Sequence, residues 1–145
     1  MKKLLFAIAF AFIALTSFSQ DVEWLSYRNE TGFWNTYTKK WDWQPMNQSR
    51  IPIHFIGMEI RLTNKDKSVY TLTISEGTKD EYDKEGVKRR VSTWFAYDKN
   101  NRKCKIRVTK FYSDEYDPLV LTVIYDDVCF RFYCMDDTID KFRND

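Results

Sequence analysis

The sequence has few of the residues from which most catalytic and metal sites are built. It contains a single histidine, His54, and three cysteines among its 145 residues. The spacings H-x-H and H-E-x-x-H, which bind zinc, are absent. No serine lies in a nucleophile-elbow context, and no D-x-D-x-D-G run is present for calcium. We therefore predict a protein that is not an enzyme, with no catalytic residues, no metal site and no cofactor.

The sequence also lacks an excess of positive or negative charge when its N-terminal segment is left out of the count. Residues 1–19 have the order of a secretory signal peptide: Lys2 and Lys3, the apolar run 4–15, then small serines. That run is shorter than the roughly 20 residues that cross a bilayer, so we expect cleavage and no membrane insertion. Because this leader holds two lysines and no acid, the other 126 residues contain 21 basic and 21 acidic residues. This neutral balance excludes a general attraction to nucleic acid, and the leader predicts a secreted or periplasmic protein.

Helical periodicity is almost absent after the leader. Apolar residues alternate by two instead, which is typical of strands with one buried face. The predicted strands cover residues 21–27, 33–43, 50–56, 58–64, 68–74, 91–97, 104–108, 119–125 and 128–134. Short connections without crossover helices predict a single antiparallel all-β domain over residues 20–145, with about eight or nine strands. A small barrel and a curved sandwich both fit this pattern.

The alternation is clearest near the C-terminus, where it predicts a register. If Asp126 and Asp127 form a two-residue turn, each cross-strand pair joins two side chains that face the core. The predicted pairs are Tyr125–Val128, Val123–Phe130, Leu121–Phe132 and Leu119–Cys134. Turn and hydrophobic pattern therefore agree on one hairpin.

Two segments do not follow the strand pattern. Residues 76–90 hold five acids and five bases in fifteen positions, a composition that predicts a charged, mobile surface loop. Residues 136–145 form a polar C-terminal tail. Neither segment suggests a second domain.

The segment "FWNTYTKKWDW", residues 33–43, contains three of the five tryptophans. Interpreted as one strand, it directs its odd-numbered residues to the core: Phe33, Asn35, Tyr37, Lys39, Trp41 and Trp43. Core packing is the favoured interpretation, since large aromatic side chains dominate the cores of small β domains. The functional alternative is an exposed ligand-binding platform made of four residues: Trp34, Trp41, Trp43 and Lys39.

The cysteines predict buried thiols without a disulfide. Export would permit a bridge, but the odd number leaves at least one thiol free. The predicted strand positions also place no two cysteines within the Cα separation of about 7 Å that a disulfide needs.

Together these observations favour an exported all-β binding or interaction module. Its candidate partners are a protein, a glycan or a small apolar ligand. One alternative is a lipocalin-like carrier, whose barrel would be hollow. Another is a small hydrolase that uses scattered carboxylates or His54.

Overall fold

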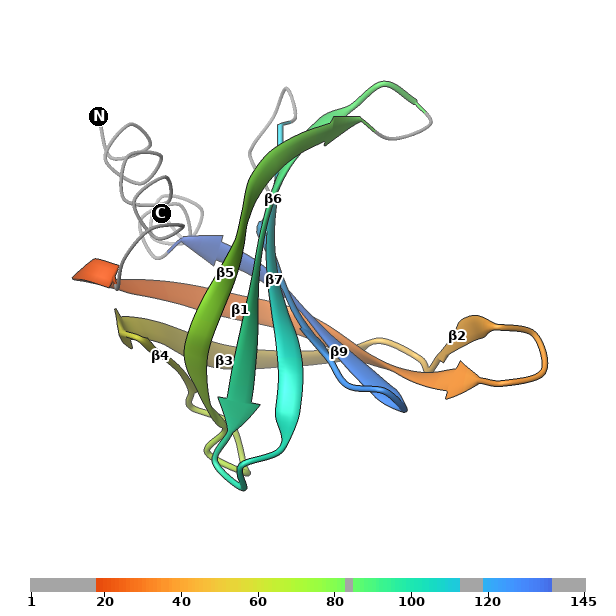
Figure 1. The fold of residues 1–145 in the computed structure, drawn as a ribbon, viewed down its shortest axis with the longest axis horizontal. Helices are drawn as coiled ribbons and strands as arrows, with labels where there is room; N and C mark the ends of the chain where they lie inside the picture. The colour runs from red at the N-terminus through yellow and green to blue at the C-terminus, as the bar shows by residue number, and fades with distance from the viewer. Residues whose placement is uncertain (1–17, 83–84, 113–118, 137–145) are drawn as a thin grey trace.

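The computed structural model describes residues 18–82, 85–112 and 119–136. In these ranges all regular secondary structure is β-strand (Figure 1). The nine strands are β1 (Phe18–Asn35), β2 (Lys40–Trp43), β3 (Asn47–Gly57), β4 (Glu59–Leu62), β5 (Val69–Tyr82), β6 (Lys88–Asp98), β7 (Lys103–Phe111), β8 (Leu119–Ile124) and β9 (Val128–Asp136). In this part of the chain no helix is long and apolar enough to cross a bilayer. Of the predicted leader and tail, residues 1–17 and 137–145 lie outside the described residues.

The strands form one sheet that closes on itself. Each strand is antiparallel to its neighbours, and from β3 to β9 the order around the sheet follows the chain. β1 closes the ring, because it pairs with β3 on one side and with β9 on the other. β2 pairs only with the end of β1 and extends the sheet beyond the ring. The predicted antiparallel all-β fold is confirmed, and of the two architectures considered it is the barrel.

The predicted C-terminal hairpin is confirmed residue by residue. Three of the four predicted pairs are register partners in β8 and β9, and the fourth closes the turn, where the Tyr125 N–H donates to the Val128 carbonyl at 2.8 Å. The register partners are Leu119–Cys134, Leu121–Phe132 and Val123–Phe130. All of these side chains belong to the core or pack against it.

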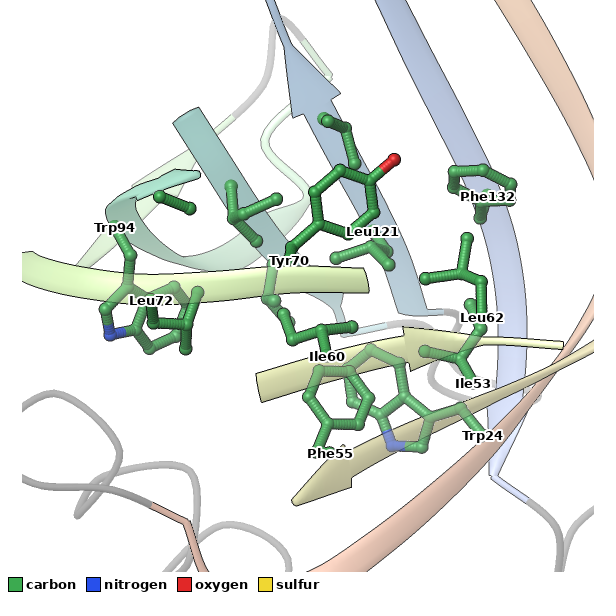
Figure 2. Close-up of a cluster of buried hydrophobic side chains, with 14 of the residues drawn as sticks. Trp24, Ile53, Phe55, Ile60, Leu62, Tyr70, Leu72, Trp94, Leu121 and Phe132 are labelled. Carbon is green, nitrogen blue, oxygen red and sulfur yellow. The ribbon is translucent and has the colours of Figure 1, made fainter. Parts of the chain in front are cut away.

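Side chains from every strand of the ring fill its interior. Figure 2 shows them pointing toward one another, with the rings of Trp24 and Phe55 in an edge-to-face contact at a centroid distance of 4.5 Å. Ile53, Ile106 and Leu121 have no exposed surface. An eight-stranded barrel is just wide enough to be filled in this way, and the interior is packed except at the end where Tyr70, Tyr125 and Phe132 border a pocket of about 350 Å³.

A β-bulge at Tyr27 reverses the two faces of β1. Ser26 lies opposite Cys134 and Arg28 lies opposite Tyr133, so Tyr27 is the extra residue. The buried Ser26 hydroxyl donates to the carbonyls of Arg28 at 3.1 Å and Tyr133 at 3.2 Å, which holds the bulge. Even-numbered residues therefore face the interior before the bulge and the outside after it.

The prediction of a loop over residues 76–90 was wrong. β5 continues to Tyr82 and β6 begins at Lys88, so most of this segment is a hairpin. Its charges neutralise one another across the two strands, which is why so polar a sequence can form a sheet. The cross-strand ion pairs are Asp80–Arg90, Asp80–Lys88 and Glu81–Arg89.

Candidate functional site

The side chain of Asn35 turns the chain between β1 and β2. Its Oδ1 accepts the N–H groups of Tyr37 at 2.9 Å and Thr38 at 3.1 Å, and its carbonyl accepts the Lys39 N–H at 2.8 Å. Lys39 adopts a left-handed backbone with φ of 56°. Asparagine favours such turns because its amide takes the place of a backbone acceptor. Residues 33–43 are therefore a hairpin, and the prediction of one strand was wrong.

The hairpin places three indoles on one face. Trp34 lies opposite Trp41, and Gly32 lies opposite Trp43, so the three tryptophans project to the same side. Ring centroids are 5.2 Å apart for Trp34 and Trp41 and 6.4 Å apart for Trp41 and Trp43. The Trp43 ring covers the glycine, where a Cβ atom would lie only 2.9 Å from it. The result is a row of aromatic rings outside the barrel.

The favoured interpretation of this segment as core was also wrong. Tyr37 is 96 % exposed and Phe33 is 50 % exposed, although both occupy positions predicted to face inward. The indoles inside the barrel are those of Trp24 and Trp94, which come from other strands. The prediction from even and odd positions was wrong here because the turn at Asn35 interrupts the alternation between Trp34 and Trp41.

The β2 indoles form one wall of a groove on the outside of the barrel. Its volume is about 390 Å³, within the range of small-molecule sites. Its floor consists of outward-facing residues that are buried without joining the core: Thr109, Val120, Thr122 and Cys129. Its walls include Trp41, Trp43, Arg89, Arg107, Arg131 and Tyr133.

Several strands contribute to this groove. The β1–β2 and β5–β6 hairpins leave the ring in different directions, to the right and upward in Figure 1. The indoles come from β2, whereas Arg89, Arg107 and Arg131 come from β6, β7 and β9. The fold thus brings together basic and aromatic side chains that are far apart in the sequence.

The side chain of Arg131, in the wall of the groove, is held in place by its neighbours. Its Cζ lies 3.8 Å from the centre of the Trp43 ring, a cation–π contact. Arg131 Nη1 donates to Glu30 Oε1 at 3.2 Å, and the Tyr133 hydroxyl donates to the same oxygen at 2.8 Å. Burial and the bond to Glu30 both raise the pKa of Tyr133, so its phenol stays neutral. Glu30, whose side chain is 11 % exposed, therefore anchors both groove residues.

The groove is positively charged. Among the described residues, its lining contains three arginines and neither Asp nor Glu. Arg89 is paired with Glu81 at 2.8 Å, and Arg131 with Glu30. Arg107 is exposed, and in the described part of the chain its guanidinium has no carboxylate within ion-pair distance. One positive charge is thus left without a partner.

Two of the four predicted binding residues, Trp41 and Trp43, line the groove. Trp34 is 40 % exposed and touches Trp41 from outside the lining, and Lys39 lies at the exposed turn of the hairpin. The sequence did not single out Tyr133 or the three arginines. The even–odd alternation of residues in β7 and β9 predicts which of these side chains face outward. Nothing in the sequence shows that these side chains meet in one groove.

A second pocket, of about 350 Å³, lies at the end of the barrel where the β4–β5, β6–β7 and β8–β9 turns meet. Burial raises the pKa of Tyr70 to about 12 and also that of Tyr125. The Tyr125 hydroxyl donates to Asp98 Oδ2 at 2.8 Å, while Oδ1 accepts the N–H groups of Asn100 and Arg102 at 2.9 Å. These polar groups hold the β6–β7 turn, and we assign them a structural role.

All three cysteines are free and buried, as predicted. Burial raises the pKa of the Cys104 and Cys129 thiols to about 11 and that of Cys134 to about 12. His54 lies outside the groove on β3, with Nε2 3.2 Å from Glu23 Oε1. No cluster of His, Cys, Asp or Glu that could hold a metal ion occurs within the described ranges.

Comparison with known proteins finds no relative of this chain. No family model matches the chain, and neither a curated protein nor a solved structure matches it. Function is therefore inferred from the groove.

Proposed function

We propose that the protein is an exported binding module that holds a sugar ring of a glycan in the groove between β2 and the outer faces of β6–β9. The observation that carries this proposal is the wall formed by Trp41 and Trp43 beside hydroxyl and guanidinium groups. The negative face of an indole attracts the slightly positive C–H groups of a pyranose ring. Hydroxyl and guanidinium groups can then hydrogen-bond the sugar hydroxyls.

The size of the groove favours a glycan over a protein partner. A groove of about 390 Å³ fits one or two sugar rings, and small-ligand sites have about 300–1,000 Å³. A stable protein interface buries about 800 Å² on each partner and needs a much broader face.

Neither the polar groove nor the interior of the barrel favours binding of a small apolar ligand. If an apolar ligand filled the groove, the guanidinium of Arg107, which has no carboxylate partner among the described residues, would lose water and gain no hydrogen bond in return. The ring interior, where a lipocalin-like carrier would hold its ligand, is filled by side chains apart from the pocket at one end, whose polar groups hold the β6–β7 turn. We propose no reaction for this site, since His54 does not line it.

The test is a titration of the mature chain with short oligosaccharides of varied composition, followed by tryptophan fluorescence and calorimetry. Trp41→Ala should weaken binding about tenfold or more, because a few aromatic residues that contact the ligand often carry most of the affinity. Tyr37→Ala is the matched control, since this aromatic belongs to the same hairpin, is 96 % exposed and does not line the groove. Equal binding by wild type and Trp41→Ala, with both proteins folded, would overturn the proposal.

A further inference from the structure

We infer that the glycan is acidic, and that its carboxylate or sulfate group lies against Arg107 and Arg131. This inference rests on the proposed function and adds the charge of the ligand. It follows from three features of the groove: the composition of its lining, the free donors of Arg131 and the unpaired state of Arg107.

The lining composition is unusual for this chain. Lysine and arginine number 23 and aspartate and glutamate 21 in the whole sequence, so a surface with three cations should also carry acids. Within the described residues the lining has none. The two neighbouring carboxylates, Glu30 and Glu81, are each hydrogen-bonded to one of its arginines. They neutralise two of the three positive charges and leave the third for a ligand.

Arg131 is oriented before any ligand arrives. Its guanidinium is held against Trp43 and by a single bond to Glu30, yet the side chain is 39 % exposed. A guanidinium has five N–H donors, so several remain available on a group that is already fixed. A planar fork of this kind matches the two oxygens of a carboxylate or sulfate. Little conformational entropy would then be lost on binding.

The surroundings of Arg107 give it no other partner. It also borders a smaller pocket of about 200 Å³ that contains Glu76 and Lys79. Glu76 is paired with Lys105 at 3.1 Å, and Lys79 with Glu81 at 3.3 Å. The nearby acids are therefore already engaged, and the guanidinium of Arg107 stays free at the edge of the groove.

The experiment compares matched acidic and neutral probes on the mature chain. The carboxylate arm uses oligogalacturonate and its neutral methyl ester, and the sulfate arm uses short dextran sulfate and unsulfated dextran. Polyglutamate, which carries carboxylates but no sugar ring, controls for charge alone. We expect one acidic sugar to bind about tenfold or more tightly than its neutral counterpart, and the preferred arm identifies the anion.

Arg107→Gln should remove this preference while leaving the fold unchanged, because the side chain is exposed and unpaired. Arg61→Gln is the matched control, since Arg61 is an exposed arginine on β4 that does not line the groove. Affinity for the acidic sugar should also fall several-fold between about 50 mM and about 500 mM salt, where the Debye length shrinks from above 10 Å to below 5 Å.

The outcomes separate this inference from the proposed function. Equal affinity for neutral and acidic sugars, with loss of binding in Trp41→Ala, overturns the acidic ligand and supports the sugar site. Equal affinity for polyglutamate and the acidic sugars overturns the sugar site. Absence of binding to every probe by a folded protein overturns both.

Discussion

The guanidinium of Arg131 on β9 lies 3.8 Å from the centre of the Trp43 ring on β2, and so joins two strands that share no backbone pairing. Both strands pair with β1, and Trp43 covers Gly32 of that strand. The short β2 is thereby attached to the barrel through side chains as well as through its hydrogen bonds to β1. The position of the groove wall depends on these contacts.

Gly32→Ala should displace the Trp43 ring. The new Cβ atom would lie 2.9 Å from Trp43 Cε3 and 3.0 Å from Cζ3, closer than carbon atoms approach in proteins. We expect the free energy of unfolding to fall by about 1–3 kcal/mol, as in other overpacked sites. Tryptophan emission should shift to the red as the indole becomes hydrated.

The control for this substitution is a double-mutant cycle. In a Trp43→Leu background the smaller side chain removes the clash, so Gly32→Ala should cost less there than in the wild type. Equal costs in both backgrounds, with unchanged emission, would show that the ring does not lie over the glycine.

Glu30→Gln should loosen the groove wall that contains Arg131 and Tyr133. Glu30 accepts hydrogen bonds from Arg131 and Tyr133, and its side chain is only 11 % exposed. Because hydrogen bonds to a charged group contribute more than neutral ones, we expect a loss of about 1–3 kcal/mol in urea unfolding. Glu59→Gln breaks a more exposed pair with Arg61 and should cost less than about 1 kcal/mol. A similar cost for the two variants would contradict the anchoring role of Glu30.

The register of β8 with β9 was predictable because nothing interrupts it. Val123 and Phe130 both face the core, and a two-residue turn fixes their pairing. A shift by one residue would expose every apolar side chain of the strand, so a pattern of this kind permits one register.

Elsewhere, irregularities that have no clear sequence signal changed the faces of the strands. The bulge at Tyr27 and the turn at Asn35 together decide where the hairpin tryptophans point. Ile74 continues the alternation of Tyr70 and Leu72, yet it is 65 % exposed because the β5–β6 register shifts between Leu72 and Ser75. The even–odd alternation of a strand therefore predicts which side chains face the core only between such bulges, turns and register shifts.

The groove itself could not be predicted, because its indole wall on β2 meets the outer faces of β6–β9 only through closure of the sheet. Arg89 lay in a segment whose local composition indicated a loop, and its partner Glu81 stands on the opposite strand. Arg107 and Arg131 occupy outward positions that are ordinary for solvated side chains. The pairing of β1 with β9, which closes the ring, is what brings the β2 indoles beside these three cations.

The buried thiols should be unreactive in the native protein. Burial raises the pKa of Cys104 and Cys129 to about 11 and that of Cys134 to about 12, and only the thiolate attacks a disulfide reagent. At pH 8 a thiol with a pKa near 11 is ionised in about one molecule in a thousand, so labelling should be at least about 100-fold slower than for free cysteine. In urea all three should react. Fast labelling of one thiol in the native protein would contradict its burial. If this occurs, Cys129→Ser would show whether the reactive thiol is the one in the groove floor.

Asp98 should make the protein less stable in acid. Burial alone would raise its pKa, but hydrogen bonds from the Arg102 N–H, the Tyr125 hydroxyl and the Asn100 N–H hold the pKa below the ordinary value of 3.8. A carboxylate with a depressed folded pKa contributes stability that is complete above the unfolded pKa and is lost as the pH falls through the folded one.

We therefore expect the wild type to be more stable than Asp98→Asn at pH 7 and at pH 5, by the same amount. The difference should shrink below the ordinary carboxyl pKa of 3.8, as measured by urea unfolding at each pH. Asp66→Asn, in the same pocket, is the matched control: Asp66 is exposed, and among the described residues no hydroxyl donates to its carboxylate as Tyr125 does to Asp98, so this variant should unfold like the wild type. A difference for Asp98→Asn that stays constant to pH 2 would mean that its charge does not hold the turn, because neutral hydrogen bonds alone would then account for it.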